Sequence, residues 1–328
     1  LRLIAYLGYK FNDKFLFNSE IEFEHGSTGR GGEASVEFAY LDYRLSPHLG
    51  LRGGVLLVAM GLINELHEPP TFLGTTRPLT EQLIVPSTWR ESGLGVFGDL
   101  GAVAYRVYVI NGLDAVGGGS SAASGFGAGG IRGGRQNGSR ALAEELAGVA
   151  RLDYTGVLGL TVGGSAYLGN SGQNRTVTTV GGPIDLGART LIWEGHLAYQ
   201  RRGLDLRGLF ATATVDQAAT INAARGLTGA ASVGERLVGW YAQAGYDALR
   251  GTRTGHQLVP YVRYERVNTQ DRVPSGFAAN PANDRRIVSL GAAWRPIGNI
   301  AVKVDYQLQH NEARTGVDQL NANLSYLF

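Results

Sequence analysis

Several kinds of residue are absent or scarce in this chain, and each absence excludes a class of protein. The 328 residues contain no cysteine, so the chain forms no disulfide and offers no thiolate to a metal ion. Methionine occurs once, and charged residues make up only 18% of the chain, with a formal net charge of +2. The basic residues are scattered and balanced by acidic ones, which argues against a nucleic-acid-binding protein.

Long apolar runs are absent as well. No window approaches the roughly 20 consecutive apolar residues that a membrane-spanning helix requires. This absence does not exclude a membrane protein, because the strands of a membrane β-barrel are short and apolar only at alternate positions. The chain begins inside an expected strand and no signal peptide precedes Leu1, so we expect the N-terminus to be processed, truncated or incomplete.

What the chain does have is a regular alternation of apolar and polar residues, clearest in its last twelve. The apolar parity there consists of Leu320, Ala322, Leu324, Tyr326 and Phe328. A period of two predicts a strand whose faces meet different surroundings. In a soluble sandwich the apolar face packs on a second sheet, whereas in an outer-membrane barrel it contacts lipid. Leu324, Tyr326 and the terminal Phe328 also resemble the insertion signal that the bacterial barrel-assembly machinery recognises.

The same alternation predicts about fifteen strands, and their connections separate the two alternatives. Short turns, such as those at Asn12 and at Pro47, alternate with longer loops, among them 61–92 and a glycine-rich loop, 111–147. Short turns at one end and long loops at the other are the outer-membrane arrangement, and a sandwich has no reason for this asymmetry. We therefore predict an all-β fold, a single transmembrane antiparallel β-barrel domain over residues 1–328. Because bacterial barrels usually have an even number of strands, we expect a sixteenth strand before Leu1.

The loop at 61–92 is expected to fold into the barrel and narrow it. It is too long for an ordinary connection and too apolar for a solvated tether, with Leu73, Ile84 and Trp89 among its residues. The alternative is a cap across the outer rim or against a neighbouring subunit. The charged and ionisable residues assigned to the constriction are Glu65, His67, Glu68, Arg77, Glu81 and Arg90. In the other long loop, residues 111–138 are expected to be flexible, and a short helix is expected from Ser139 to Leu146.

Charged residues on the parity opposite the apolar one are expected to line a watery lumen, because alternating charges are hard to bury in a core. The expected lumenal cations are Arg2, Arg52, Arg106, Arg151, Arg207, Arg263, Arg295 and Lys303. The expected anions are Glu20, Glu22, Glu37, Asp153, Glu194, Asp205, Asp247, Glu265 and Asp305, and His196 lies among them. Eight cations against nine anions predict a mixed wall with weak ion selectivity.

Patterns that carry chemistry are missing. The chain has no nucleophile elbow, P-loop or dinucleotide fingerprint, so neither an enzyme nor a cofactor is expected. Glu65, His67 and Glu68 offer three potential metal ligands within four residues. Such clusters are common by chance and His67 is expected to form a hydrogen bond, so no metal site is predicted. Glu194 and His196 share one strand face, which favours lumen lining over acid–base chemistry.

Six stretches resemble the phosphate-selective porin (porin O and P) family. The resemblance covers both ends of the chain, whereas the middle shares only the alternation of strands and connections. The stretches are EASVEFAYL from Glu33, LRGGV from Leu51, MGLI from Met60, PSTWRESG from Pro86, AVKVDY from Ala301 and LSYLF from Leu324. The resemblance implies a sixteen-stranded, homotrimeric porin with an inward-folded loop and an N-terminal strand absent here. It also implies anion selectivity through lumenal arginines, which the balanced charges of this chain do not reproduce.

The function expected from these features is passive diffusion of small hydrophilic solutes or ions through the outer membrane of a Gram-negative cell. The expected partners are outer-membrane lipids, two further copies of the chain and, during insertion, the barrel-assembly machinery. One alternative is a structural barrel that anchors or sheathes another envelope component. A second alternative, an enzyme barrel, requires a catalytic group near the outer rim, and the sequence offers none.

Overall fold

In the computed structural model, the described residues are 2–24, 32–118, 122–179 and 181–326. Leu1, Phe328 and the side chain of Arg2, all assigned roles above, lie outside this description. Fifteen strands form one antiparallel sheet, and β9 and β10 form a separate hairpin. The strands are β1 (Arg2–Lys10), β2 (Phe15–Glu24), β3 (Glu33–Ser46), β4 (Leu49–Leu57), β5 (Arg90–Leu100), β6 (Val103–Asn111), β7 (Leu146–Tyr154), β8 (Leu160–Gly169), β9 (Arg175–Thr179), β10 (Gly182–Leu186), β11 (Thr190–Arg201), β12 (Leu204–Val215), β13 (Arg236–Tyr246), β14 (Gln257–Arg272), β15 (Asp284–Ile297), β16 (Ile300–Asn311) and β17 (Gln319–Tyr326).

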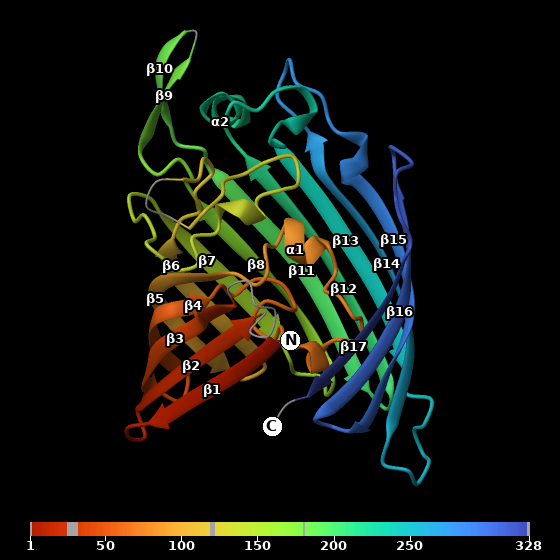
Figure 1. The fold of residues 1–328 in the computed structure, drawn as a ribbon. Coiled ribbons are helices and arrows are strands. Elements are labelled where there is room, and N and C mark those ends of the chain that lie inside the picture. Colours follow the sequence, from red (N-terminus) through yellow and green to blue (C-terminus); the bar gives the residue numbers. More distant parts are fainter. Residues whose placement is uncertain (1, 25–31, 119–121, 180, 327–328) are drawn as a thin grey trace.

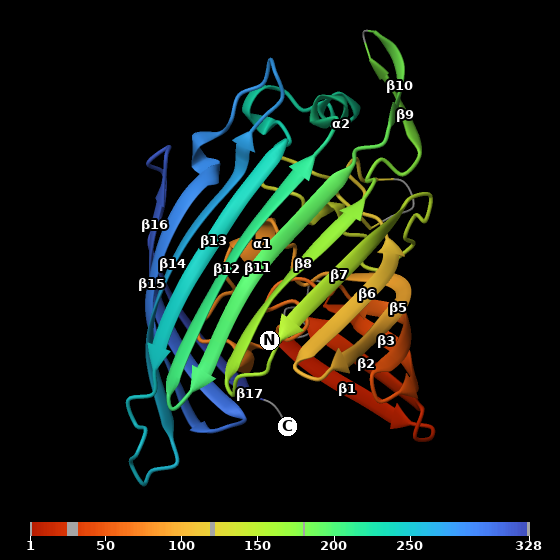
Figure 2. The same ribbon diagram turned by 180° about the vertical axis from the view of Figure 1, so that it is seen from behind.

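The large sheet follows chain order, and each strand pairs with the next one along the chain, except that β8 pairs with β11. Figure 1 shows this sheet curling around the segment that joins β4 to β5, and Figure 2 shows the continuous wall from behind. The predicted all-β, fifteen-stranded barrel architecture is confirmed. Within the described ranges, no helix reaches the length and hydropathy of a membrane-crossing helix.

The two edges of the sheet are β1 and β17. β1 pairs with β2 and β17 pairs with β16, and the described residues record no pairing between β1 and β17. Closure through a sixteenth strand before Leu1 therefore stays a prediction.

The strands have one exposed apolar face and one buried face, as the alternation predicts. In β7, exposed and buried residues alternate throughout, with Leu152 exposed and Arg151 buried. Trp193, Trp240 and Trp294 lie on the exposed face of β11, β13 and β15. Large apolar side chains exposed on one strand after another form a continuous apolar surface. Such a surface is unfavourable in contact with water and favourable in contact with lipid. The outer face of the sheet is therefore its lipid-contacting surface.

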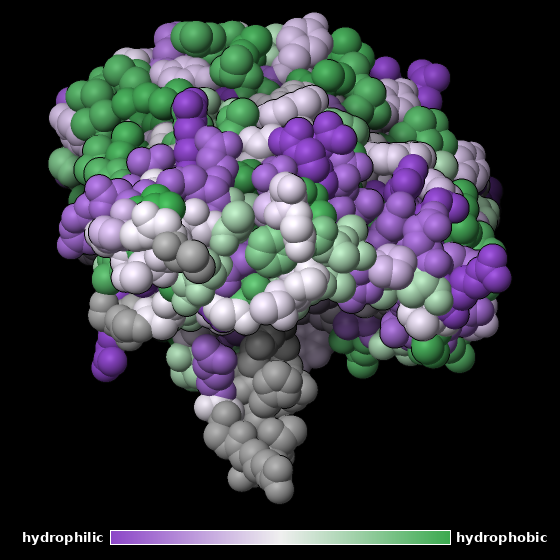
Figure 3. Space-filling model, turned by 90° about the horizontal axis from the view of Figure 1, so that it is seen from above, coloured by the Kyte–Doolittle hydropathy of each residue, from purple (hydrophilic) through white to green (hydrophobic). Residues whose placement is uncertain are grey.

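The connections differ between the two ends of the sheet. Figure 1 shows the long loops at the top and mostly short turns at the bottom. Two of the long loops contain elements of their own, namely the β9–β10 hairpin and helix α2 (Ala218–Arg225). The connection between β13 and β14, at the end with the short turns, occupies residues 247–256. Figure 3 looks down on the loop end, where hydrophilic side chains gather over the middle and hydrophobic ones lie along parts of the margin.

The glycine-rich loop contradicts two predictions. It is not a flexible linker, because Leu113, Phe126 and Ile131 are fully buried. No helix forms from Ser139 to Leu146 either, since the strand β7 already begins at Leu146. The Gln136 side chain instead accepts a hydrogen bond from the Leu142 amide (2.6 Å) and donates one to the Leu142 carbonyl (3.0 Å), which satisfies these groups outside a helix.

An apolar core fills part of the barrel interior. The segment between β4 and β5 contributes Met60, Ile84 and Trp89, and the glycine-rich loop contributes Phe126 and Ile131. These side chains pack against apolar residues on the inner face of the wall. The wall residues in this core are Leu56, Tyr108, Ile110, Ala147, Val149, Tyr167, Ile192, Leu209, Ala211, Ala213, Val215, Leu237, Tyr241 and Val267.

Candidate functional site

The segment from residue 58 to residue 89 crosses the interior of the barrel and is called the inner loop below. It contains the short helices η1 (Pro69–Thr71) and α1 (Thr80–Leu83), and Figure 1 shows it within the curled sheet. Its bounds differ from the expected 61–92, because Arg90, assigned above to the constriction, is the first residue of β5. There its Nη1 lies 2.6 Å from Glu37 Oε1, so Arg90 belongs to the wall.

One wall lysine holds the middle of the inner loop. Lys303, on β16, is 1% exposed and donates hydrogen bonds to the carbonyl oxygens of Phe72 (2.6 Å), Gly74 (3.0 Å) and Pro69. Its Nζ also lies 4.2 Å from the centre of the Phe72 ring, within the range of a cation–π interaction. Three backbone carbonyls therefore converge on one ammonium group, which satisfies all three of its donors.

Wall arginines hold the neighbouring carbonyls in the same manner. Arg295 donates to Pro70 (3.1 Å), and Arg207 donates to Thr71 (3.0 Å). Lumenal cations predicted from strand parity thus contact the peptide backbone of the inner loop. If these cations faced water in place of the inner loop, the channel would be wider and its wall more charged.

Wall carboxylates hold the donors of the inner loop. Asp305, on β16, accepts hydrogen bonds from both the amide and the hydroxyl of Thr75, each at 2.7 Å. Glu265, on β14, accepts one from the Leu79 amide at 2.6 Å. Arg263 lies beside Glu265 and donates to the Thr76 carbonyl at 3.2 Å. Donors and acceptors of the inner loop are therefore both paired with charged side chains of the wall.

Two acidic residues of the inner loop bind to other strands of the wall. Glu65 lies 3.1 Å from Arg106 Nε and 3.4 Å from Arg151 Nη1. Glu81 is fully buried and accepts hydrogen bonds from the Tyr241 hydroxyl (2.5 Å) and the Ile63 amide (2.8 Å). Burial raises the pKa of Glu81 above its ordinary value, against the opposing effect of these two donors.

Many of the remaining wall charges neutralise one another across or along strands. Arg52 binds Asp42 through two bonds of 2.7 and 2.9 Å, and its guanidinium lies 4.0 Å from the centre of the Tyr40 ring. The other close pairs are Arg90–Glu37 (2.6 Å), Arg151–Asp153 (2.7 Å), Arg207–Asp205 (3.0 Å) and Arg263–Glu265 (3.3 Å). Asp247, assigned above to the lumen, instead accepts hydrogen bonds from the backbone amides of Leu249, in the β13–β14 connection, and Leu258, in β14.

His196 lies in a chain of polar groups that is unsuited to acid–base chemistry. Its Nδ1 lies 2.8 Å from Glu194 Oε2, and its Nε2 lies 2.8 Å from Asp153 Oδ1. Both ring nitrogens therefore face carboxylates, and neither has a free lone pair with which to accept a substrate proton. Ser165 donates to Glu194 at 2.5 Å rather than to the histidine, so no nucleophile–base pair forms here.

Polar cavities remain beside the inner loop. One, of about 550 Å³, lies between the inner loop and strands β14 to β17, and its lining includes Gln82, Gln307 and Gln319. A second, of about 330 Å³, is lined almost wholly by polar groups. The charged residues of this second cavity are Glu22, Glu33, Glu37, Arg77, Arg90, Arg132 and Arg135.

Sequence reasoning missed Arg132 and Arg135, which come from the glycine-rich loop. Burial and the neighbouring Arg77 lower the pKa of Arg132 to about 10. Burial and the neighbouring Arg132 lower the pKa of Arg135 to about 9. Both remain cationic at neutral pH, so the second cavity carries four arginines against three glutamates. Two arginines within four residues of a glycine-rich segment were the only signal in the sequence.

The remaining assigned residues fall on the faces that parity predicts. Glu20 and Glu22 are buried on β2. Leu324 and Tyr326, assigned to the insertion signal, are exposed on β17, on the lipid-contacting face. Phe328 lies outside the described residues, so its part in insertion stays a prediction.

Known proteins resemble this chain in fold and, in one case, in sequence. No protein-family model matches it, so the resemblance to the porin O and P family stays unconfirmed. Salmonella typhi OmpF in complex with daunomycin matches with a TM-score of 0.61 at 15% identity, over 99% of this chain and 89% of OmpF. OmpTΔL8 of Vibrio cholerae matches with a TM-score of 0.58 at 10% identity, over 99% and 89% of the two chains. An anion-selective porin from Comamonas acidovorans matches with a TM-score of 0.52 at 12% identity, over 98% and 87%.

One relative in sequence is an uncharacterized protein of Aquifex aeolicus (strain VF5). It is 36% identical to this chain over 335 residues, which cover all of this chain and 74% of that protein. The solved structures are too distant in sequence to transfer a function, but they share the barrel over nearly the whole chain. The chain therefore belongs to the family of the Aquifex aeolicus protein, and its fold is that of the outer-membrane porins.

Proposed function

We propose that the protein is an outer-membrane porin, a passive diffusion channel for small hydrophilic solutes. The observation that carries the proposal is the inner loop, which wall side chains hold inside the barrel while polar cavities remain beside it. A loop held in this way narrows a wide barrel without closing it. Nothing in the mechanism requires energy coupling, because selection by bore and wall charge is sufficient.

The route of permeation follows from where the interior is filled. The wall residues of the apolar core lie mostly on β6 to β13, with Leu56 on β4 and Val267 on β14, and they pack against the inner and glycine-rich loops. The cavity of about 550 Å³ lies on the other side of the inner loop, toward β14 to β17. Gln307 and Gln309 of β16 line it with neutral amides. We infer that solutes pass between the inner loop and this part of the wall.

Weak ion selectivity follows from the pairing of the wall charges. Arg52, Arg207 and Arg263 each have a carboxylate within 3.3 Å, so they add little net field to the bore. The second cavity has an excess of one cation, four arginines against three glutamates, at one side of the inner loop. We therefore expect a small preference for anions rather than a selective anion path.

The apolar core also favours a second candidate, a structural barrel that anchors another envelope component. Trp89 and Phe126 are fully buried inside the barrel, where a wide water-filled pore would leave them solvated. A barrel closed by this core would insert into membranes and pass no solute. A homotrimer and contact with the barrel-assembly machinery stay predictions under either function.

Solute flux separates the two candidates. The purified protein is reconstituted into liposomes, and swelling rates are measured with uncharged sugars of increasing size. A porin of this design gives swelling that falls steeply as the sugar grows. Liposomes that contain folded, inserted protein and do not swell even with the smallest sugar would exclude the channel and favour the anchor.

A further inference from the structure

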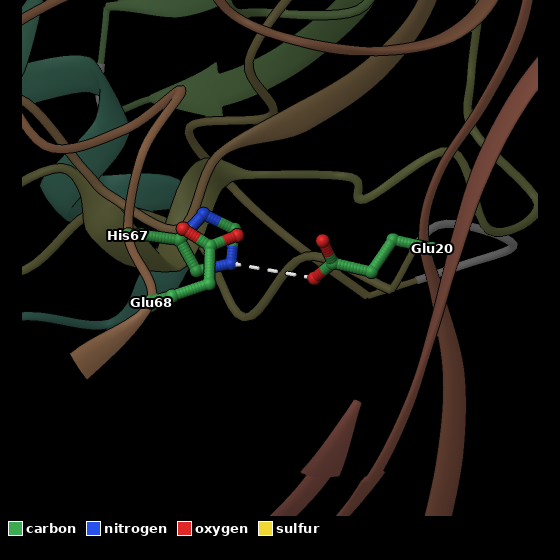
Figure 4. A group of neighbouring side chains, drawn as sticks. All are labelled: Glu20, His67 and Glu68. Atoms are coloured by element: carbon green, nitrogen blue, oxygen red, sulfur yellow. Dashed lines mark ion pairs between the residues drawn. The ribbon is translucent and has the colours of Figure 1, made fainter. Parts of the chain in front are cut away.

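A cluster of potential metal ligands joins the inner loop to the second strand of the wall. His67 and Glu68 of the inner loop and Glu20 of β2 offer ligand atoms that all lie within 4.8 Å of one another. Figure 4 shows the His67 ring facing the Glu20 carboxylate, with Glu68 beside the ring. The distance from His67 Nε2 to Glu20 Oε1 is 3.9 Å, which is too long for a hydrogen bond.

The other ring nitrogen of His67 fixes which atom faces this cluster. Nδ1 lies 3.1 Å from the Asn64 carbonyl oxygen, which only accepts hydrogen bonds, so Nδ1 carries the hydrogen. Nε2 of the neutral ring then holds a lone pair. His67 is fully buried, and among the described residues its Nε2 has no hydrogen-bond partner. A backbone carbonyl on one ring nitrogen is the usual support of a histidine that binds metal through the other.

The other histidines with defined partners differ from His67 in one respect each. Both nitrogens of His196 face carboxylates at 2.8 Å, which leaves no lone pair for a metal. His48 also has its Nδ1 against a backbone carbonyl, that of Asp99 at 2.8 Å, but it is exposed in a turn. Within the described part of the chain, only the cluster at His67 brings three such ligands together. His48 is therefore a matched control.

We propose that Glu20, His67 and Glu68 bind a divalent transition-metal ion of the Zn²⁺ class. One imidazole nitrogen and two carboxylate oxygens are a ligand set that Zn²⁺ accepts, with water in the fourth position. Metal–ligand distances near 2.1 Å place tetrahedral ligands about 3.4 Å apart, so the 3.9 Å between His67 and Glu20 has to close by about half an ångström. Two carboxylates neutralise the charge of the ion.

One of the three potential ligands that lie together in the sequence is replaced by a residue from the wall. Glu65, which lies close to His67 in sequence, is engaged by Arg106 and Arg151 instead. The third ligand, Glu20, comes from 47 residues away and completes a set that the local sequence does not reveal. A bound ion would connect the wall at β2 to the inner loop, and the inference of binding is independent of any flux through the barrel.

Metal titration tests the site. Tag-free protein in detergent is stripped with chelator and titrated with ZnCl₂ in a calorimeter, with CaCl₂ as a second probe. The variants are His67→Gln, Glu20→Gln and Glu68→Gln, with His48→Gln as the control. Folding of each is first checked by comparing the electrophoretic mobility of unheated and heated samples. Glu68 is only half-buried, so Glu68→Gln keeps the test possible if the buried variants fail to fold.

The expected result is one equivalent of Zn²⁺ bound by the wild type and by His48→Gln, with no comparable binding of Ca²⁺. The affinity should fall at least tenfold in His67→Gln and Glu20→Gln and also fall in Glu68→Gln. Equal Zn²⁺ binding in the wild type and all three ligand variants would overturn the proposal. Absence of Zn²⁺ binding by the folded wild type would do the same.

Discussion

Lys303 offers a sharp test of how the inner loop is held. Replacing it with methionine keeps a long apolar side chain and removes the ammonium group that binds the carbonyls of Pro69, Phe72 and Gly74. Hydrogen bonds to a charged group contribute about 1.5–3 kcal/mol each. The loss is smaller than the sum of three, because the burial cost of the cation disappears as well and the freed carbonyls can bind water. We expect docking of the segment 69–76 to weaken by about 2–3 kcal/mol.

Amide hydrogen exchange, followed by mass spectrometry, measures this directly. A loss of about 2–3 kcal/mol corresponds to roughly 30- to 150-fold faster exchange in peptides that cover 69–76, because about 1.4 kcal/mol is a factor of ten. Peptides from β7 and β14 should exchange at the wild-type rate. The control is Lys10→Met, since Lys10 pairs with Asp13 in an exposed turn and contacts no part of the inner loop. Exchange in 69–76 within twofold of the wild type, in folded Lys303→Met, would refute the docking argument.

Two further predictions concern charge. Glu81→Gln should reduce the pH dependence of stability. Burial raises the pKa of Glu81 above its ordinary 4.5, so between the two pKa values the folded state holds a proton that the unfolded state releases. The free energy of unfolding of the wild type therefore falls as the pH rises from the unfolded-state pKa to the folded-state pKa. Urea unfolding in detergent from pH 4 to pH 8 measures it, and an equal slope in wild type and variant would contradict the assignment. The reversal potential of the channel in a salt gradient should be far below that of a channel that passes ions of one sign only. We expect a slight anion preference, which Arg132→Gln removes. Near-ideal selectivity for either sign would show that the wall charges do not neutralise one another.

The strands could be predicted from the sequence because their two faces meet lipid and interior. In β7, Leu152 and Tyr154 alternate with Arg151 and Asp153, and exposed and buried residues alternate along the whole strand. A period of two identifies a strand wherever both faces are constrained. Parity also placed Lys303 and Asp305 on the inner face. Most of their partners on the inner loop could not be predicted, because they are backbone groups such as the Phe72 carbonyl and the Thr75 amide, which carry no sequence signal.

The interior loops mark where sequence reasoning fails. Glycine is common in flexible linkers, so residues 111–138 were expected to be mobile. Phe126 and Ile131 within that stretch instead insert into the apolar core. The Glu20–His67 contact was likewise out of reach, since it depends on the path that the inner loop takes across the barrel. The composition of a segment indicates how readily it is solvated. It does not show whether other parts of the chain provide an apolar surface against which the segment can pack.

We propose that the inner loop sets the bore of an open channel, and single-channel conductance in planar bilayers measures that bore. Residues 65–85 are replaced with a short Gly-Ser bridge, and the variant is compared with the wild type at equal insertion. We expect stable conductance steps for the wild type and larger steps for the variant. Equal steps would place the constriction outside the inner loop, and a correctly inserted wild type without any steps would contradict the channel itself.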